Sequence, residues 1–322
     1  MLACAGFGVM SLGLVQLSVS AAELELKFSH SAPKTHVKGR SADHFADLVA
    51  KYSNGNIKVN VFPGSQLMKE KEEIRAAARG QLDIIAPFIP YYSAIDKAWN
   101  IFGQPLLFKT TEEAMKTFIG PVGQEILGNL SAKGLKGVAI WHDGPVYMFS
   151  KGDAIATRAQ LKGFKIRVFP SAPLILMMKK LGAVPVTMPA AEVPLGLSQG
   201  TVSGVVTTPT FAAPAKWYEF LKGMTRAPLG YGGYGVAVSQ KTWDKMSSSQ
   251  RNIIEKAIKE AEQFNHKIAL QNITDQEKIL ADNGVKIADI SKSELASWSG
   301  DAAAVWKEQD PAVQALIKKI QN

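Results

Sequence analysis

The feature that most constrains the fold is an alternation of strand-like and helix-like segments along the chain. Apolar and polar residues alternate in 24–28 and 57–61, a period typical of half-buried strands, and a helix capped by Ser41 is predicted between them. A charged helix is predicted at 69–79 and a buried strand at 83–86. Such an order predicts a parallel sheet with helices on both faces.

A second set of the same kind follows in the middle of the chain. Strands are predicted at 138–141, 164–169, 184–187 and 202–207, with a helix at 171–180. Two α/β units of similar size predict two lobes with a cleft between them.

Residues 247–283 form one long helical pattern, which would be about 55 Å long if unbroken. Asn272, Ile273 and Thr274 are poor helix formers, so two interpretations are open. The segment either breaks there into two helices or bridges both lobes.

The first 22 residues carry no charged side chain and end in small residues at Ser20 and Ala22. This pattern predicts a signal peptide cleaved before Glu23, and hence export to the periplasm. A membrane anchor is the competing interpretation, because the stretch is long enough to span a bilayer.

Composition excludes several classes of site after residue 22. The single cysteine is Cys4, so residues 23–322 have no thiol for a disulfide, a nucleophile or a metal. The net charge is +9, but the basic residues are scattered among acids, so we expect attraction for anions and no nucleic acid binding.

Arg167 is the strongest candidate for ligand binding. It lies at the end of a predicted strand, and Pro170 and a helix start follow directly. An arginine in this position points into a crevice, where its guanidinium can bind a carboxylate through two parallel hydrogen bonds. The alternative is an arginine in an ordinary surface ion pair.

Two glycine-containing motifs resemble enzyme sites but have the wrong surroundings. Gly196–Gly200 matches the Gly-x-Ser-x-Gly elbow with Ser198 as nucleophile, yet a helix precedes it and a strand follows, the reverse of an elbow. Gly230–Gly235 has dinucleotide spacing but leads into a strand, where a phosphate site needs a helix N-terminus.

Histidines are concentrated near the start, at His30, His36 and His44. Their spacing fits no zinc motif, so we expect ordinary cleft or surface histidines and no metal site. A metal receptor stays open as a minor alternative.

Several segments in a fixed order resemble the solute-binding proteins of TRAP (tripartite ATP-independent periplasmic) transporters, the dicarboxylate-binding-protein-like family. The most specific contains Arg167. They run through nearly the whole chain after residue 22: Gly55–Val59, Pro63–Leu67, Arg79–Ile84, Pro105–Phe108, Leu161–Val168, Leu181–Val186 and Gln199–Gly204.

This resemblance implies two α/β lobes that close on a small solute, with a long helix running across both. It implies a monomer without catalysis or cofactor, which delivers a small organic anion to membrane permease subunits. The lobes expected are 23–144 with about 233–272, and 145–232 with about 273–322. The arginine matching Arg167 binds the substrate carboxylate in this family.

Other positions depart from the family pattern. Thr207 stands where an asparagine is common, Tyr147 where a second arginine is frequent, and Ala190 where a ring usually packs. Ser203 replaces the usual acid, and valines follow it. Fewer polar groups favour a monocarboxylate with an apolar or aromatic body over a dicarboxylate or a sugar acid.

We therefore expect six ligand-binding residues. Arg167 would pair with the carboxylate, and Tyr147, Thr207 and His30 would donate hydrogen bonds, while Phe88 and Phe211 would shape the apolar end. Alternatives are a receptor that presents its ligand to a membrane sensor, an esterase-like enzyme using Ser198, and the metal receptor.

Overall fold

Two mixed β-sheets, one in each lobe, organise the molecule. The computed structural model describes residues 23–321, so the predicted signal peptide lies outside the described residues. The first sheet has the order β2-β1-β3-β10-β4, and the second β11-β9-β5-β8-β6-β7. The strands of the first sheet are β1 Leu24–Ser29, β2 Ile57–Phe62, β3 Ile84–Ile85, β4 Leu135–Pro145 and β10 Tyr231–Ser239. Those of the second are β5 Tyr147–Ser150, β6 Lys165–Val168, β7 Val184–Thr187, β8 Gly204–Thr207, β9 Gly223–Arg226 and β11 Lys286–Asp289.

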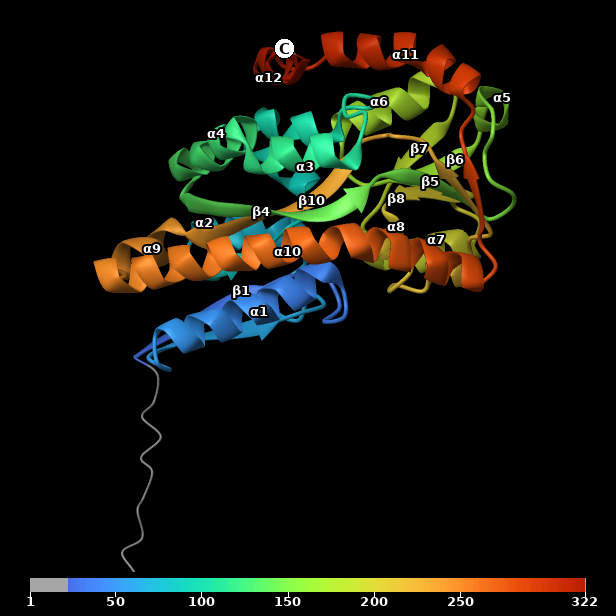
Figure 1. The fold of residues 1–322 in the computed structure, drawn as a ribbon. Helices are drawn as coiled ribbons and strands as arrows, with labels where there is room; N and C mark the ends of the chain where they lie inside the picture. Colours follow the sequence, from blue (N-terminus) through green and yellow to red (C-terminus); the bar gives the residue numbers. More distant parts are fainter. Residues whose placement is uncertain (1–22, 322) are drawn as a thin grey trace, which may run out of the picture.

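The helices cover both sheets and their ends (Figure 1). The α-helices are α1 Val37–Tyr52, α2 Glu70–Ala78, α3 Thr111–Ile119, α4 Pro121–Asn129, α5 Arg158–Leu161, α6 Ala172–Lys180, α7 Val193–Ser198, α8 Pro209–Ala212, α9 Gln240–Lys245, α10 Ser248–Asp282, α11 Lys292–Lys307 and α12 Pro311–Gln321. Short 3-10 helices are η1 Ile89–Ala94, η2 Lys97–Gly103, η3 Leu130–Lys133, η4 Ala190–Glu192 and η5 Trp217–Glu219.

The two-lobed α/β prediction is confirmed, but a purely parallel sheet is wrong. β1 pairs in parallel with β2 and β3, whereas β10 is antiparallel to both β3 and β4. β10 follows β5–β9 of the second sheet in sequence and returns to the first sheet. The chain thus crosses between the lobes from β4 to β5 and back from β9 to β10, and it returns to the second sheet once more at β11.

The long helix α10 is continuous over 35 residues. It packs on α1 and β4 of the first lobe and on α8 of the second, and it runs along the molecule in Figure 1. No break occurs at Asn272, which is buried. The bridging interpretation is therefore correct.

Two local expectations need correction. The first helix begins at Val37, and its cap is His36, whose Nδ1 accepts a hydrogen bond from the Lys38 amide. Ser41 lies inside this helix and donates to the Val37 carbonyl. The C-terminal helix α12, within the segment predicted for the second lobe, packs against η2 and α4 beside the first sheet.

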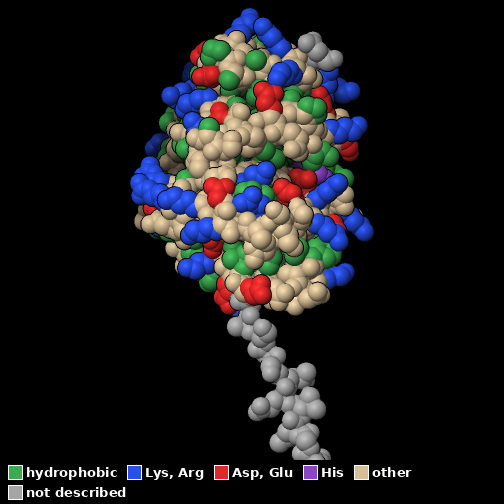
Figure 2. Space-filling model, turned by 90° about the vertical axis from the view of Figure 1, so that its left-hand side faces the viewer, with side chains coloured by type: hydrophobic (Ala, Val, Ile, Leu, Met, Phe, Trp, Pro, Cys, Tyr) green, Lys and Arg blue, Asp and Glu red, His purple; other side chains and the backbone are tan. Residues whose placement is uncertain are grey.

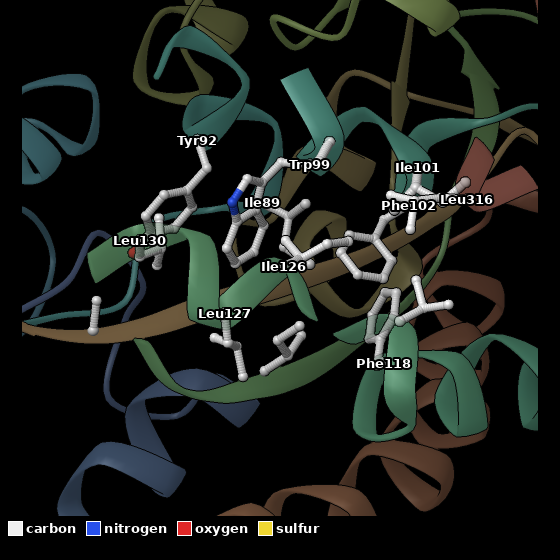
Figure 3. Packing of buried hydrophobic residues seen from close by; sticks show 14 of the residues in the cluster. Ile89, Tyr92, Trp99, Ile101, Phe102, Phe118, Ile126, Leu127, Leu130 and Leu316 are labelled. Carbon is white, nitrogen blue, oxygen red and sulfur yellow. The ribbon is translucent and has the colours of Figure 1, made fainter. Parts of the chain in front are cut away.

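Each lobe has its own core, and aromatic side chains fill the largest one, which lies in the first lobe. Tyr92 stacks on Trp99 with ring centroids 4.4 Å apart, and Phe102 meets Phe118 edge-to-face at 4.2 Å (Figure 3). Leu316 of α12 completes this cluster. Rigid packing of this kind holds the strand ends that form the cleft.

The surface shows no large basic block on the face seen in Figure 2, where lysines and arginines are interspersed with acids. Among the helices within residues 23–321, none is both long and apolar enough to cross a bilayer.

Candidate ligand-binding cleft

A cavity between the lobes, with about 410 Å³ of space among its atoms, brings together the ends of strands from both sheets. The first lobe contributes Ser31, Glu70, Phe88, Tyr91, Asp143 and Tyr234. The second lobe contributes Arg167, Phe169, Ala190, Thr207, Thr208, Phe211 and Trp217. The carboxyl ends of parallel strands in α/β sheets are the usual place for ligands, and β6 and β8 end here.

Arg167 is the central cation of this cavity. It is 3% exposed and forms no ion pair with any acid among residues 23–321. Its Nε donates to the Met188 carbonyl at 3.0 Å and its Nη1 to the Val206 carbonyl at 3.4 Å. A guanidinium has five N–H donors, so three remain for a ligand. The surface ion pair considered from the sequence is therefore excluded.

Aromatic faces hold the guanidinium of Arg167 in place. Its central carbon lies 6.0 Å from the ring centroid of Phe169 and 5.9 Å from that of Trp217. Burial lowers the pKa of Arg167 to about 10, against the opposing effects of Tyr91 and Glu70. The group is still charged at neutral pH, and a buried charge without a counter-ion is unfavourable.

Aromatic rings also form the walls. Phe88 meets Phe169 across the cleft edge-to-face, with centroids 5.0 Å apart. The rings of Phe211 and Trp217 meet edge-to-face, with centroids 5.4 Å apart. Thr207, at the end of β8, is buried, and its hydroxyl makes no hydrogen bond within the described part of the chain. Arg167, Thr207, Phe88 and Phe211 therefore share one cavity.

The other two predicted residues lie elsewhere. Tyr147 lines a separate cavity beside the inter-lobe crossings, with Phe108, Pro145 and Tyr231. His30 is fully buried against Phe28, and burial together with Lys38 lowers its pKa to about 3. Its neighbour Ser31 faces the ligand cavity instead.

Sequence reasoning missed three residues here: Glu70 and Asp143 of the cavity lining, and Lys38, which is bonded to Glu70. Lys38 is fully buried, and its Nζ donates to Ser31 Oγ at 3.0 Å, to Glu70 Oε1 at 3.1 Å and to the Ala86 carbonyl at 3.1 Å. Its ammonium also lies 3.9 Å from the centroid of the Tyr234 ring. These bonds commit Lys38 to the protein, so it does not compete with Arg167 for an anion.

Asp143 is the third of these residues. It accepts hydrogen bonds from the hydroxyls of Thr208 and Thr210, each at 2.7 Å, and lies 3.2 Å from His36 Nε2. Burial alone would raise the pKa of Asp143, but His36 and the two hydroxyls hold it below its ordinary value. Asp143 thus stays ionised and joins the two lobes.

The enzyme and metal alternatives find no support in the geometry. Ser198 ends α7 and donates to the Leu195 carbonyl, away from any strand-to-helix elbow. Gly230 directly precedes β10, and the other residues of Gly230–Gly235 lie within this strand. Within residues 23–321, no group of three or more His, Cys, Asp and Glu side chains is arranged to hold a metal ion.

Two α/β lobes that enclose a small cavity with one uncommitted cation define a receptor for small solutes. The chain matches the model of the bacterial extracellular solute-binding protein, family 7 (DctP) over residues 28–311, and it belongs to this family. The resemblance to TRAP solute-binding proteins is confirmed, and the family is one of binding proteins without catalysis.

Individual relatives cover nearly the whole chain. It is 32% identical to the C4-dicarboxylate-binding periplasmic protein DctP of Rhodobacter capsulatus, over 95% of this chain and 90% of that protein. A TRAP periplasmic solute binding protein of Sulfurospirillum deleyianum with bound succinate is 28% identical, with a TM-score of 0.87 over 93% of this chain and 99% of that one. A TRAP periplasmic solute binding protein of Xanthobacter autotrophicus with bound β-D-galacturonate is 25% identical. Its TM-score is 0.86, over 92% of this chain and 98% of that one.

Proposed function

We propose that this protein is the periplasmic receptor of a TRAP transporter and captures a small organic acid between its lobes for delivery to membrane permease subunits. The observation that carries the proposal is Arg167, a buried guanidinium with three uncommitted N–H donors and no acid paired with it. A bound carboxylate supplies the missing counter-ion. The named ligands of the relatives, succinate and galacturonate, are acids of this kind.

We further propose that this acid has one carboxylate and an apolar or aromatic body. Among the described residues that line the cavity, Arg167 is the only lysine or arginine, and the nearby Lys38 is bonded to Glu70. A second ligand carboxylate would lie in the same cavity as Glu70 and Asp143, and like charges repel strongly where water is excluded. The remaining lining is rich in rings, which pack against apolar and aromatic groups.

Thr207, Phe88 and Phe211 complete the proposed binding site. The hydroxyl of Thr207 has no partner within residues 23–321 and can donate to the ligand. Phe88 and Phe211 lie on opposite lobes, so both meet the ligand only when the lobes close. A ligand-presenting receptor for a membrane sensor would use the same site, and a gene pair for small and large permease subunits beside this gene would favour transport.

The test compares two variants on the same strand. Arg167→Ala should weaken binding of the best carboxylate by about 2–5 kcal/mol, the range for removing one partner of a buried charge pair. Lys165→Ala, an exposed cation on β6, should leave the affinity unchanged. Titration calorimetry on protein stripped of captured ligand measures both. Undiminished affinity in the folded Arg167→Ala variant would refute the proposal.

A further inference from the structure

Glu70 presents an uncommitted carboxylate oxygen to the cavity that contains Arg167. Its Oε1 accepts from the Phe88 amide at 2.8 Å and from Lys38 Nζ at 3.1 Å. Its Oε2 accepts no hydrogen bond from any residue in the range 23–321, although the side chain is only 15% exposed. This oxygen is not sealed off from solvent, so a donor group of a bound ligand can reach it.

The charges at the cavity also favour a ligand that carries both signs. Arg167 and Lys38 are cations, and Glu70 and Asp143 are anions. A zwitterion brings one group of each sign into the closed cleft, and Arg167 and Glu70 in the lining offer a partner to each.

We propose that the ligand is a zwitterion of the amino-acid type, with its carboxylate on Arg167, its ammonium group at Glu70 Oε2, and an apolar or aromatic body against the rings. This inference rests on the proposed function, because it needs Arg167 as the carboxylate site. The rings of Phe88 and Tyr91 line the same cavity as Glu70, and aromatic faces attract cations. Glu70 is thereby a specificity-determining residue.

The test uses matched ligands that differ in one group. Stripped wild-type protein is titrated with three series of equal body size: alanine, leucine and phenylalanine, their amine-free acids, and their 2-hydroxy analogues. For the body that fits, the amino acid should bind at least tenfold more tightly than either analogue. This comparison needs no variant, so it stands even if substitutions at Glu70 impair folding.

A variant then assigns the preference to Glu70. In Glu70→Gln the amide oxygen can keep the bonds to Lys38 and Phe88, while its NH₂ group faces the ligand in place of Oε2. The preference for the amino acid should disappear. Glu72→Gln, the same change at an exposed position on α2, should keep it.

The outcomes separate the two proposals. If neither the acids of the three series nor a dicarboxylate binds, the proposal of a carboxylate receptor is itself wrong. If amine-free or hydroxy acids bind as tightly as the amino acids, carboxylate binding at Arg167 is supported, but the proposal of a zwitterionic ligand is wrong. If the amino-acid preference survives in folded Glu70→Gln, Glu70 is not its cause.

Discussion

Buried ionisable side chains next to the cleft differ in how they are stabilised. Lys38 and Glu70 form an ion pair, and Asp143 receives hydroxyl hydrogen bonds. Glu73, one turn along α2 from Glu70, is fully buried, and its single hydrogen-bond donor within residues 23–321 is Ser29 Oγ, at 2.8 Å. Burial, with the neighbouring Glu70, raises the pKa of Glu73 to about 8. Glu73 therefore retains its proton at neutral pH in the folded protein.

This proton makes stability depend on pH. The folded pKa of Glu73 lies above its ordinary value of 4.5, so between about 4.5 and 8 only the folded state holds the proton. The free energy of unfolding contributed by this group therefore decreases as the pH rises through that window. Glu73→Gln, a neutral side chain of the same shape, should gain melting temperature relative to wild type between pH 5 and pH 8. A difference between the two proteins that stays constant over this range would show that Glu73 is ionised throughout.

At this scale the sequence predicted that Arg167 lies in a crevice, but it did not predict the charged neighbours of Arg167. Arg167 stood out because a strand end followed by a helix start places a side chain in a crevice. Lys38 and Glu70 lie in charged stretches whose sequence predicts exposure to solvent. Their burial depends on tertiary contacts, of Lys38 with the Ala86 carbonyl and of Glu70 with the Phe88 amide. His30 was expected in the pocket because β1 ends there, but the strand alternation turns it inward and Ser31 outward.

Among the elements, α10 connects the two lobes. It contacts α1, β4 and α8, so it spans both lobes. Asn265 is its fully buried polar residue in the first lobe. Its Oδ1 accepts from the His142 amide at 2.6 Å, and its Nδ2 donates to Ser41 Oγ at 3.1 Å. One side chain thus connects α10, β4 and α1, directly before Asp143.

Removing this side chain should be costly. Asn265→Ala leaves the buried His142 amide without its acceptor, and we expect a loss of about 1–3 kcal/mol in the free energy of unfolding. Asn252→Ala, at an exposed position on the same helix, should change it by less than about 0.5 kcal/mol. Urea denaturation followed by circular dichroism measures both. Equal losses in the two variants would contradict the bridging role of Asn265.

Element types were more predictable than their arrangement. Hydrophobic periodicity located most strands and the helices α1, α2, α6 and α10, since it depends on local sequence. The strand β10 pairs with β3 and β4 after an intervening lobe, and no local pattern encodes that antiparallel return. The capping role of His36 was missed because serine is the commoner cap, and Ser41 is instead buried against α10.

For the whole molecule, the lobes are in contact across the cleft. The hydroxyls of Thr208 and Thr210 reach Asp143 from the opposite lobe, and Phe88 meets Phe169. Arg167 is enclosed by this arrangement. We therefore expect a bound anion to favour the closed form, because the anion neutralises a charge that closure removes from water.

The most direct test is a thermal-shift screen of protein that has been unfolded and refolded to remove captured ligand. The panel contains aliphatic and aromatic monocarboxylates, amino acids, dicarboxylates, sugar acids, neutral sugars and divalent metals. At 100 times its dissociation constant a ligand stabilises by about 2.7 kcal/mol, which corresponds to a shift of roughly 5 °C in a chain of this size. We predict shifts of that size only for compounds with a single carboxylate and an apolar or aromatic body, amino acids included. Shifts confined to neutral sugars or metals, or none at all, would mean that Arg167 is structural and that the cleft does not bind organic acids.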